Sequence, residues 1–325
     1  MRRFCGIRLG LVALSIAGGL GSLPFSAAPA PADTPLYVDW PSLFPSLDDA
    51  FNPNSANDCV AGRPNCIDIT IREMQRRFNP LAQACSHQAV FSMAYLRTTQ
   101  TYKWARDQDG FFVDTPWVNH EDAVFAKYYF RAYDNWAAGQ RSVVPQAWLI
   151  ALDAAAGRQV SGSGNLLLGM SAHVNRDLPF VLASIGITSP DGSTRKPDHD
   201  KVNQFLNAEL QQLLAEEGAR FDPAIYPNVD TPYGVGYTGL FQTLEVWREQ
   251  AWRNAEALTD ATTDAQRASV AQQIESAAAA EAQAIVAGDR YQPPLTNSSS
   301  RDAYCSVHNW DAAPLAYPWG MPSPG

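Results

Sequence analysis

The residues best placed to do chemistry are a histidine and an aspartate four positions apart, His173 and Asp177, in a stretch that is otherwise apolar. Side chains at positions i and i+4 of an α-helix lie on one face, one turn apart. An imidazole and a carboxylate arranged in this way suit one divalent metal ion, with zinc as the first choice and manganese or iron as the second. Two other interpretations stay open: a metal-free acid–base pair, or a structural hydrogen bond between the two side chains.

The stretch that carries this pair, residues 165–187, is expected to be the central helix of the fold. Its sequence, NLLLGMSAHVNRDLPFVLASIGI, is apolar almost all the way round, which is typical of a buried helix. The polar run Asn175, Arg176 and Asp177 in its middle argues against a membrane span. Pro179 has no backbone N–H, so we expect a free carbonyl at Asn175 and a kink there.

Two further carboxylates are candidate partners of the pair. Asp122 begins a tyrosine-rich helical pattern, where it is either a favourable charge at the helix N-terminus or a third metal ligand and the base for a metal-bound water. Asp200 follows Asp198 and His199 just before another helical pattern, so this cluster either caps that helix or supplies a metal ligand. The residues alone favour capping in both cases. His120 is a possible fourth ligand or a solvated loop residue.

Other polar residues are given structural roles. Arg248 and Glu245 belong to a helical pattern that ends near Leu258, and a solvated helix face accounts for them. His87 and His308 are interpreted as surface or packing residues. The chain contains no GxSxG, GxGxxG or P-loop motif, so the common signatures of serine hydrolases, dinucleotide-binding proteins and nucleotide-binding proteins are missing.

The first 32 residues have the features of a secretory signal peptide. Three arginines form a basic start, an apolar run follows from Leu9 to Gly21, and Ala28-Pro29-Ala30 or Ala30-Pro31-Ala32 offers a small-residue cleavage site. We therefore expect a secreted, extracellular protein that keeps no stable membrane anchor after cleavage.

Four cysteines follow that segment, namely Cys59, Cys66, Cys85 and Cys305. An even number in an exported chain indicates two disulfides, and four cysteines allow three pairings. Cys59 and Cys66 flank a short turn, so they are expected to form a local bridge. This leaves Cys85 to bind Cys305 and to tie the end of the chain to the domain.

The charge of the chain bears on its partners. The formal net charge is −9 and there is no run of lysine and arginine, which argues against a nucleic-acid partner. A small-molecule or lipid-like substrate or ligand is expected instead.

Helical periodicity dominates the chain, and no convincing alternating strand is found. We predict an all-α fold with one multi-helix domain over residues 33–288, which begins with an irregular segment up to Asn65. Residues 289–325 are expected to be a Pro-rich tail that is packed on the domain or tethered to it by a disulfide. The first helix of the domain is expected to stop at Asn79-Pro80.

The central motif GMSAHVNRDLP, residues 169–179, resembles the signature of an uncharacterised, mostly bacterial secreted family with a GMxAHxNxDLP pattern. Three other pieces are similar to that family: FSMAYLRTT (91–99), DAVFAKYYFRA (122–132) and REQAWRNAEAL (248–258). The resemblance covers most of the chain after the signal peptide, but it implies no established activity.

A second, more distant resemblance concerns chemistry. The zinc-dependent phospholipase C and single-strand nuclease families have a helix that reads H-x-x-x-D-(I/L), which His173, Asp177 and Leu178 match. Ala183 stands where those families have a further histidine, and the chain has only five histidines. The resemblance therefore implies at most a reduced site with one metal ion.

The leading function predicted from the sequence is an exported, metal-dependent hydrolase of ester or phosphoester bonds, with its site around His173 and Asp177. The alternative is a non-catalytic secreted binding protein with an aromatic-lined apolar cavity. The aromatic residues proposed for that cavity are Tyr128, Tyr129, Trp136, Trp148, Trp247 and Trp252.

Overall fold

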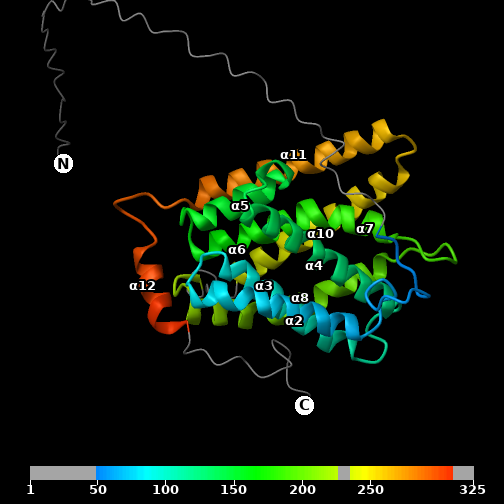
Figure 1. Ribbon diagram of the computed structural model, residues 1–325, viewed down its shortest axis with the longest axis horizontal. Coiled ribbons are helices and arrows are strands. Elements are labelled where there is room, and N and C mark those ends of the chain that lie inside the picture. Colours follow the sequence, from blue (N-terminus) through cyan, green and yellow to red (C-terminus); the bar gives the residue numbers. More distant parts are fainter. Residues whose placement is uncertain (1–48, 226–234, 310–325) are drawn as a thin grey trace, which may run out of the picture. The chain divides into compact units, whose positions relative to one another are not determined.

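The computed structural model describes residues 49–225 and 235–309, and its regular elements are helices (Figure 1). They are α2 Asn65–Gln83, α3 Ala89–Arg106, α4 Thr115–Ala137, the 3-10 turn η1 Arg141–Val143, α5 Gln146–Ala156, α6 Gly162–Ser171, the π-helical turn η2 Ala172–Asp177, α7 Leu178–Ile185, α8 Lys196–Arg220, α10 Val235–Asp260, α11 Asp264–Asp289 and α12 Ser299–His308. No strand occurs in these residues, which confirms the predicted all-α class. The predicted signal peptide and residues 310–325 of the tail lie outside the described residues.

The predicted central helix consists of three consecutive pieces, α6, η2 and α7. Pro179 cannot donate a backbone hydrogen bond to the carbonyl of Asn175, and the wider π-helical turn lies directly before it. The disturbance that the sequence predicts therefore takes the form of a π-helical turn. Together the three pieces contact α3, α4, α5, α10 and α11, and Figure 1 shows them among these helices.

Apolar side chains hold this segment in the core. Leu166, Leu168, Phe180 and Leu182 are each at most 2% exposed. Burial of one such side chain is worth about 1.5–3 kcal/mol, so the segment is held by packing on all of its sides.

Helix α2 does not stop at Pro80 as the sequence analysis predicts; it continues to Gln83. Pro80 is exposed, so the backbone carbonyl that its missing N–H leaves unpaired is on the solvent side. Met74, Phe78 and Ala82 are buried at helical spacing, and their packing continues the helix past the proline.

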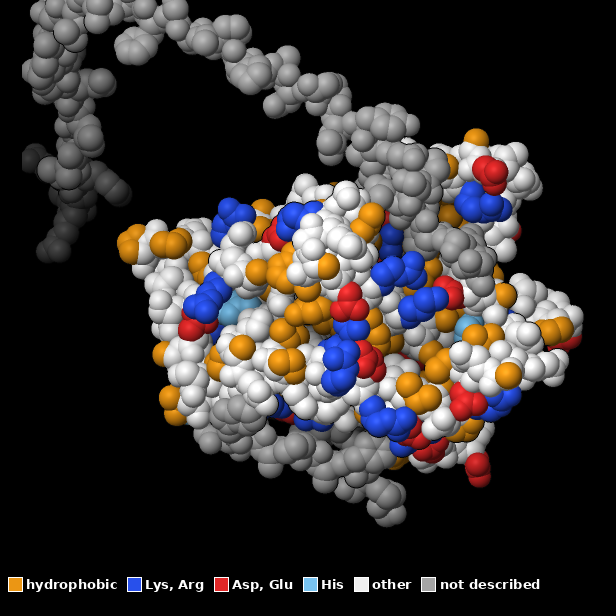
Figure 2. Space-filling view, in the orientation of Figure 1, with side chains coloured by type: hydrophobic (Ala, Val, Ile, Leu, Met, Phe, Trp, Pro, Cys, Tyr) orange, Lys and Arg blue, Asp and Glu red, His pale blue; other side chains and the backbone are white. Residues whose placement is uncertain are grey.

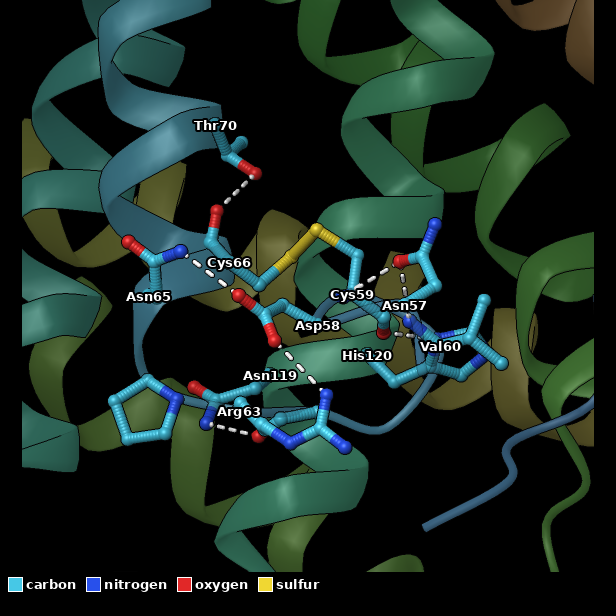
Figure 3. The surroundings of a disulfide bond; sticks show 12 residues. Asn57, Asp58, Cys59, Val60, Arg63, Asn65, Cys66, Thr70, Asn119 and His120 are labelled. Atoms are coloured by element: carbon cyan, nitrogen blue, oxygen red, sulfur yellow. Dashed lines mark hydrogen bonds and ion pairs between the residues drawn. A yellow bond between two sulfur atoms is a disulfide. The ribbon is translucent and has the colours of Figure 1, made fainter. Parts of the chain in front are cut away.

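Both disulfides have the predicted pairing. Cys59 and Cys66 close the turn before α2, with a Cα–Cα distance of 4.8 Å. In Figure 3 this bridge lies next to Asp58, which accepts hydrogen bonds from Arg63 Nη1 and Asn65 Nδ2, each at 2.8 Å. Cys85 and Cys305 join the α2–α3 loop to α12 across 220 positions of sequence.

The tail contains a helix, α12, that the sequence analysis does not predict. Its Arg301 is buried and donates to Asn165 Oδ1 at 2.6 Å and to His87 Nδ1 at 2.9 Å. Asp302 accepts from Nε2 of the same histidine at 2.8 Å. His87 is thus a buried docking residue for α12, in line with a packing role.

The outer face shown in Figure 2 carries acidic and basic side chains next to one another rather than in separate areas. Ion pairs of this kind include Glu73 with Arg76 and Arg77. Among the described residues, no helix combines the length and the apolar character that crossing a lipid bilayer requires.

Removal of the long-range disulfide, by Cys85→Ala with Cys305→Ala, is expected to lower the free energy of unfolding by about 5 kcal/mol, because the bridge restricts a very long loop in the unfolded chain. The matched control, Cys59→Ala with Cys66→Ala, opens a much shorter loop and is expected to cost about 2.5 kcal/mol. Urea unfolding followed by circular dichroism would measure both losses. Equal losses in the two double variants would contradict this account.

Candidate functional site

A cavity of about 130 Å³ lies between α3, α4, α8, α10 and the central segment, which consists of α6, η2 and α7. Apolar side chains form most of its wall, and they include Phe91, Phe125, Met170, Phe205, Leu210 and Phe241. Polar side chains are few, namely those of Thr98, Glu121, Asp122, His173, Glu209 and Arg248, together with the phenols of Tyr95 and Tyr102. An apolar hollow with a few convergent polar groups is the usual form of a small-molecule site.

His173 reaches this cavity from the π-helical turn, and Asp177 holds one side of its ring. Nδ1 of His173 is 3.0 Å from Oδ2 of Asp177. The same carboxylate accepts from Trp148 Nε1 at 2.8 Å and from Arg176 Nη1 at 2.9 Å. Because a carboxylate only accepts hydrogen bonds, Nδ1 carries the proton and Nε2 has the lone pair.

The environment of the His173 ring keeps it uncharged. The ring stacks on Phe125 with 3.5 Å between centroids, and the Tyr95 ring packs against it at 4.6 Å. Burial lowers the pKa of His173, against the opposing effect of Asp177. Nε2 is buried and has no hydrogen-bond partner among the described residues. The cavity is therefore lined by an imidazole whose acceptor nitrogen is unsatisfied.

Asp122 is also in the cavity wall, and it does not begin a helix. Asp114 caps α4 by accepting from the backbone N–H of Trp117 at 3.2 Å, so the interpretation of Asp122 as an N-terminal charge is wrong. Oδ2 of Asp122 is buried without a hydrogen-bond partner in the described part of the chain. Burial, and then the neighbouring Glu121 carboxylate, raises the pKa of Asp122 to about 8. At neutral pH this group is mostly a protonated carboxyl.

Glu209 is a site residue that the sequence analysis missed. It is 2% exposed, one oxygen accepts from Thr98 Oγ1 at 2.6 Å, and Oε2 has no partner among the described residues. Burial raises its pKa to about 7. A signal was present, because Glu209 falls three positions after Leu206 and four before Leu213, on the apolar face of its helix.

Arg248 is a second missed residue, and its assignment to a solvated face is wrong. It is 5% exposed and lines the cavity from α10. Nε donates to Asn203 Oδ1 at 2.7 Å, and Nη2 donates to the carbonyl oxygen of His199 at 2.7 Å. Arg248 comes four positions after Leu244 and four before Trp252, so the sequence also places it on an apolar helix face.

The cluster around Asp200 does not reach the cavity wall. Asp200 is exposed and binds Lys196 Nζ at 2.8 Å. Asp198 accepts from the backbone N–H groups of Val113 and Asp114, each at 2.7 Å, so it ties a loop to α8 instead of capping that helix. His120, another possible ligand, is buried in α4. One ring nitrogen is 2.7 Å from the carbonyl oxygen of Cys59, beside which it lies in Figure 3, and the other is 2.6 Å from the carbonyl oxygen of Asp49.

The aromatic residues of the cavity are not those named from the sequence. None of the six predicted lining residues is in its wall, whose rings come from Phe91, Tyr95, Tyr102, Phe125, Phe205 and Phe241. Trp148 is near, but its indole N–H is used by Asp177. Aromatic composition indicates a cavity of this kind, whereas only the packing of helices selects which rings face it.

The described residues fit a metal ion poorly. The Asp177 carboxylate already accepts from three side chains, and Asp200 lies elsewhere. No group of three His, Cys, Asp or Glu side chains in residues 49–225 and 235–309 is placed to hold an ion. The zinc site, with His173, Asp177, Asp122 and Asp200 as ligands, stays a prediction that this part of the chain does not support.

Fold and site together define an all-α protein with a small-molecule-sized cavity whose polar groups come from several helices. The chain matches the model of a Family of unknown function (DUF5995) over residues 67–288, and it belongs to that family. The matched range includes every residue that lines the cavity. No curated protein and no solved structure matches the chain. Membership of an uncharacterised family is as predicted, whereas the likeness to zinc phospholipases and nucleases stays a prediction.

The raised pKa of Asp122 predicts a pH effect on stability. The folded chain keeps a proton that the unfolded chain, with an ordinary pKa of 3.8, releases, so the stability from this group is full at low pH and is lost as pH rises towards 8. Asp122→Asn should remove a slope of about 1 kcal/mol per pH unit between pH 5 and 7.5.

Urea unfolding of the parent and of the Asp122→Asn variant at several pH values would measure that slope. Asp109→Asn, in an exposed loop, is the matched control and should keep the slope of the parent. Parallel stability curves for Asp122→Asn and the parent would show that this carboxyl is not buried in its protonated form.

Proposed function

We propose that this protein binds a small, largely apolar molecule with at least one hydrogen-bonding group in the cavity between α3, α4, α8 and α10. The observation that carries the proposal is the coincidence of apolar walls with buried polar atoms that have no partner in the described chain. Those atoms are Nε2 of His173, the hydroxyl of Tyr95, and one oxygen each of Glu121, Asp122 and Glu209.

An unpaired buried polar atom costs about 1–3 kcal/mol, so several around one hollow need a partner that the protein itself does not supply. A bound molecule with its own polar group would provide that partner. Its size follows from the cavity of about 130 Å³. Because a buried apolar cavity of about 150 Å³ accommodates benzene, a molecule of about six to eight heavy atoms is the right scale.

We also propose that the protein acts outside the cell. The signal-like first 32 residues support this, as do the two disulfides, because such bonds persist in oxidising compartments.

The cavity can be tested by filling it. Ala94 lines it, so Ala94→Leu should weaken the binding of benzyl alcohol at least about tenfold, since the added methyl groups take the space of the ring. The matched control is Ala137→Leu, the same change at an exposed position of α4, which should leave binding unchanged. Isothermal titration calorimetry would give the affinities. Equal affinity of Ala94→Leu and the parent for benzyl alcohol would contradict the proposal.

A second candidate function is metal-free hydrolysis of small apolar esters. One observation favours it. Asp177 accepts a hydrogen bond from Nδ1–H of His173, and the lone pair of Nε2 faces the cavity without a hydrogen-bond partner among the described residues. A base oriented by a carboxylate is the arrangement that takes a proton from an attacking water. The water oxygen would form the new bond to the acyl carbon while Nε2 takes a proton from the water. The bond from that carbon to the alcohol oxygen would then break, and Nε2 would pass the proton to the departing alkoxide.

For this second function, His173→Gln should lower the hydrolysis rate of short 4-nitrophenyl esters by about 10²–10⁴-fold, which is the usual contribution of a general base. His308→Gln, on α12, is the matched control and should keep the rate. Cooperative thermal unfolding of His173→Gln would show that the fold persists. Equal rates in the two variants would end this candidate, and loss of parental activity with a chelator would favour the metal-dependent hydrolase instead.

A further inference from the structure

The polar part of the cavity contains more carboxyl groups than positive charges. Glu121 and Asp122 come from α4 and Glu209 comes from α8, and each has one buried oxygen without a partner among the described residues. Glu121 and Glu209 are 5% and 2% exposed. These oxygens are acceptors when ionised, so they require a donor from something that enters the cavity.

The other titratable groups around the cavity do not offset these carboxyls. His173 is neutral, and Tyr95 and Tyr102 are buried phenols whose pKa values burial raises well above the ordinary one. Within the described residues, Arg248 is the one cation that lines the cavity, and its Nε and Nη2 donate to Asn203 and to a backbone carbonyl.

Arg106 lies outside the cavity wall, and its positive charge lowers the pKa of Asp122 against the larger effect of burial. Its side chain donates to the carbonyl oxygen of Pro64 at 3.0 Å and to Asp107 at 2.9 Å. His199, next to Arg248, has one nitrogen 4.0 Å from Glu121. An entering donor would therefore find three carboxyls against one guanidinium that is already hydrogen-bonded.

We propose that the ligand of this cavity is a small apolar amine, whose ammonium group lies beside the carboxyls of the cavity wall and whose apolar body lies against the aromatic wall. This inference rests on the proposed binding function and specifies the ligand of the same site. An ammonium is a donor with three N–H bonds and a positive charge, and it meets both needs of the carboxyls.

The aromatic wall supports the same choice of charge. The faces of aromatic rings attract cations, and the cavity has rings from α3, α4, α8 and α10. A carboxylate ligand would be repelled by every carboxyl of the wall that is ionised, and the low dielectric of the cavity strengthens that repulsion. A neutral alcohol could satisfy single oxygens, but it would leave the excess of acidic groups uncompensated.

The binding of an amine should be linked to proton release. Asp122 and Glu209, with pKa values of about 8 and about 7, are partly protonated near neutral pH, and an ammonium beside them favours the ionised form. Binding should therefore release about one proton near pH 7 and weaken as pH falls to 5.5, where both carboxyls are protonated. A purely apolar association would show neither effect.

The test measures the binding of three ligands of nearly equal shape to the full-length protein: benzylamine, benzyl alcohol and benzoate. Calorimetric titration at pH 8 should give at least about tenfold tighter binding of benzylamine than of benzyl alcohol, and no measurable binding of benzoate. Titrations in buffers of different ionisation enthalpy at pH 7 should show proton release with benzylamine only.

Two variants locate the ammonium. Glu209→Gln and Asp122→Asn should each reduce the preference for benzylamine over benzyl alcohol about fivefold or more, because one charge partner is lost. Asp109→Asn, in an exposed loop, is the matched control and should keep the preference. Circular dichroism melts would confirm that each variant is folded.

The outcomes separate the two proposals. Equal binding of benzyl alcohol and benzylamine would overturn the amine and leave the cavity as a binding site for neutral molecules. Tighter binding of benzoate would overturn the charge assignment. Absence of binding by all three ligands would overturn the binding function together with the amine. Tighter, proton-releasing binding of benzylamine that the two carboxyl variants weaken would establish the inference.

Discussion

A carboxylate that is fully buried in a helical core has to be surrounded by donors, and the donors of Asp177 come from separate parts of the fold. Trp148 reaches it from α5, His173 from one turn earlier in the π-helical segment, and Arg176 from the adjacent position. Arg176 also binds Glu275 of α11 at 2.8 Å. Loss of any of these partners would remove one of the donors that stabilise a buried charge, so the network holds α5, the central segment and α11 in one arrangement.

The cavity begins where that network ends. The Asp177 hydrogen bond settles which nitrogen of His173 carries the proton, and the stacked ring of Phe125 holds the plane of the imidazole. The carboxyls of Asp122 and Glu209 lie in the same wall, neither forms an ion pair among the described residues, and burial raises their pKa values to about 8 and about 7. Stability alone does not explain why an imidazole and two carboxyls are buried here, because burying apolar side chains of similar size would cost less free energy. Polar groups that are expensive to bury and face a hollow are instead the usual mark of a binding or catalytic site.

Much of the fold could be predicted from local patterns. Helical periodicity led to an all-α class and to a buried central helix, and Pro179 marked the place where that helix departs from regular geometry. The cysteine pairing followed from sequence proximity and elimination. Two predictions about helix extent were incomplete for one reason. Helix α2 continues past Pro80 and the tail forms α12, because tertiary packing and a disulfide stabilise turns that local sequence leaves marginal.

By itself, the sequence determined the neighbours within one helix: the spacing of His173 and Asp177, and the apolar faces on which Glu209 and Arg248 stand. Only the tertiary structure decided what those groups meet. It placed Asp122 with Glu209 at one cavity and left Asp200 in an ion pair on the surface of α8. The physical reason is that a spacing of four positions sets distances along one helix. Burial, hydrogen-bond partners and pKa depend on side chains that other helices bring from far away in the sequence.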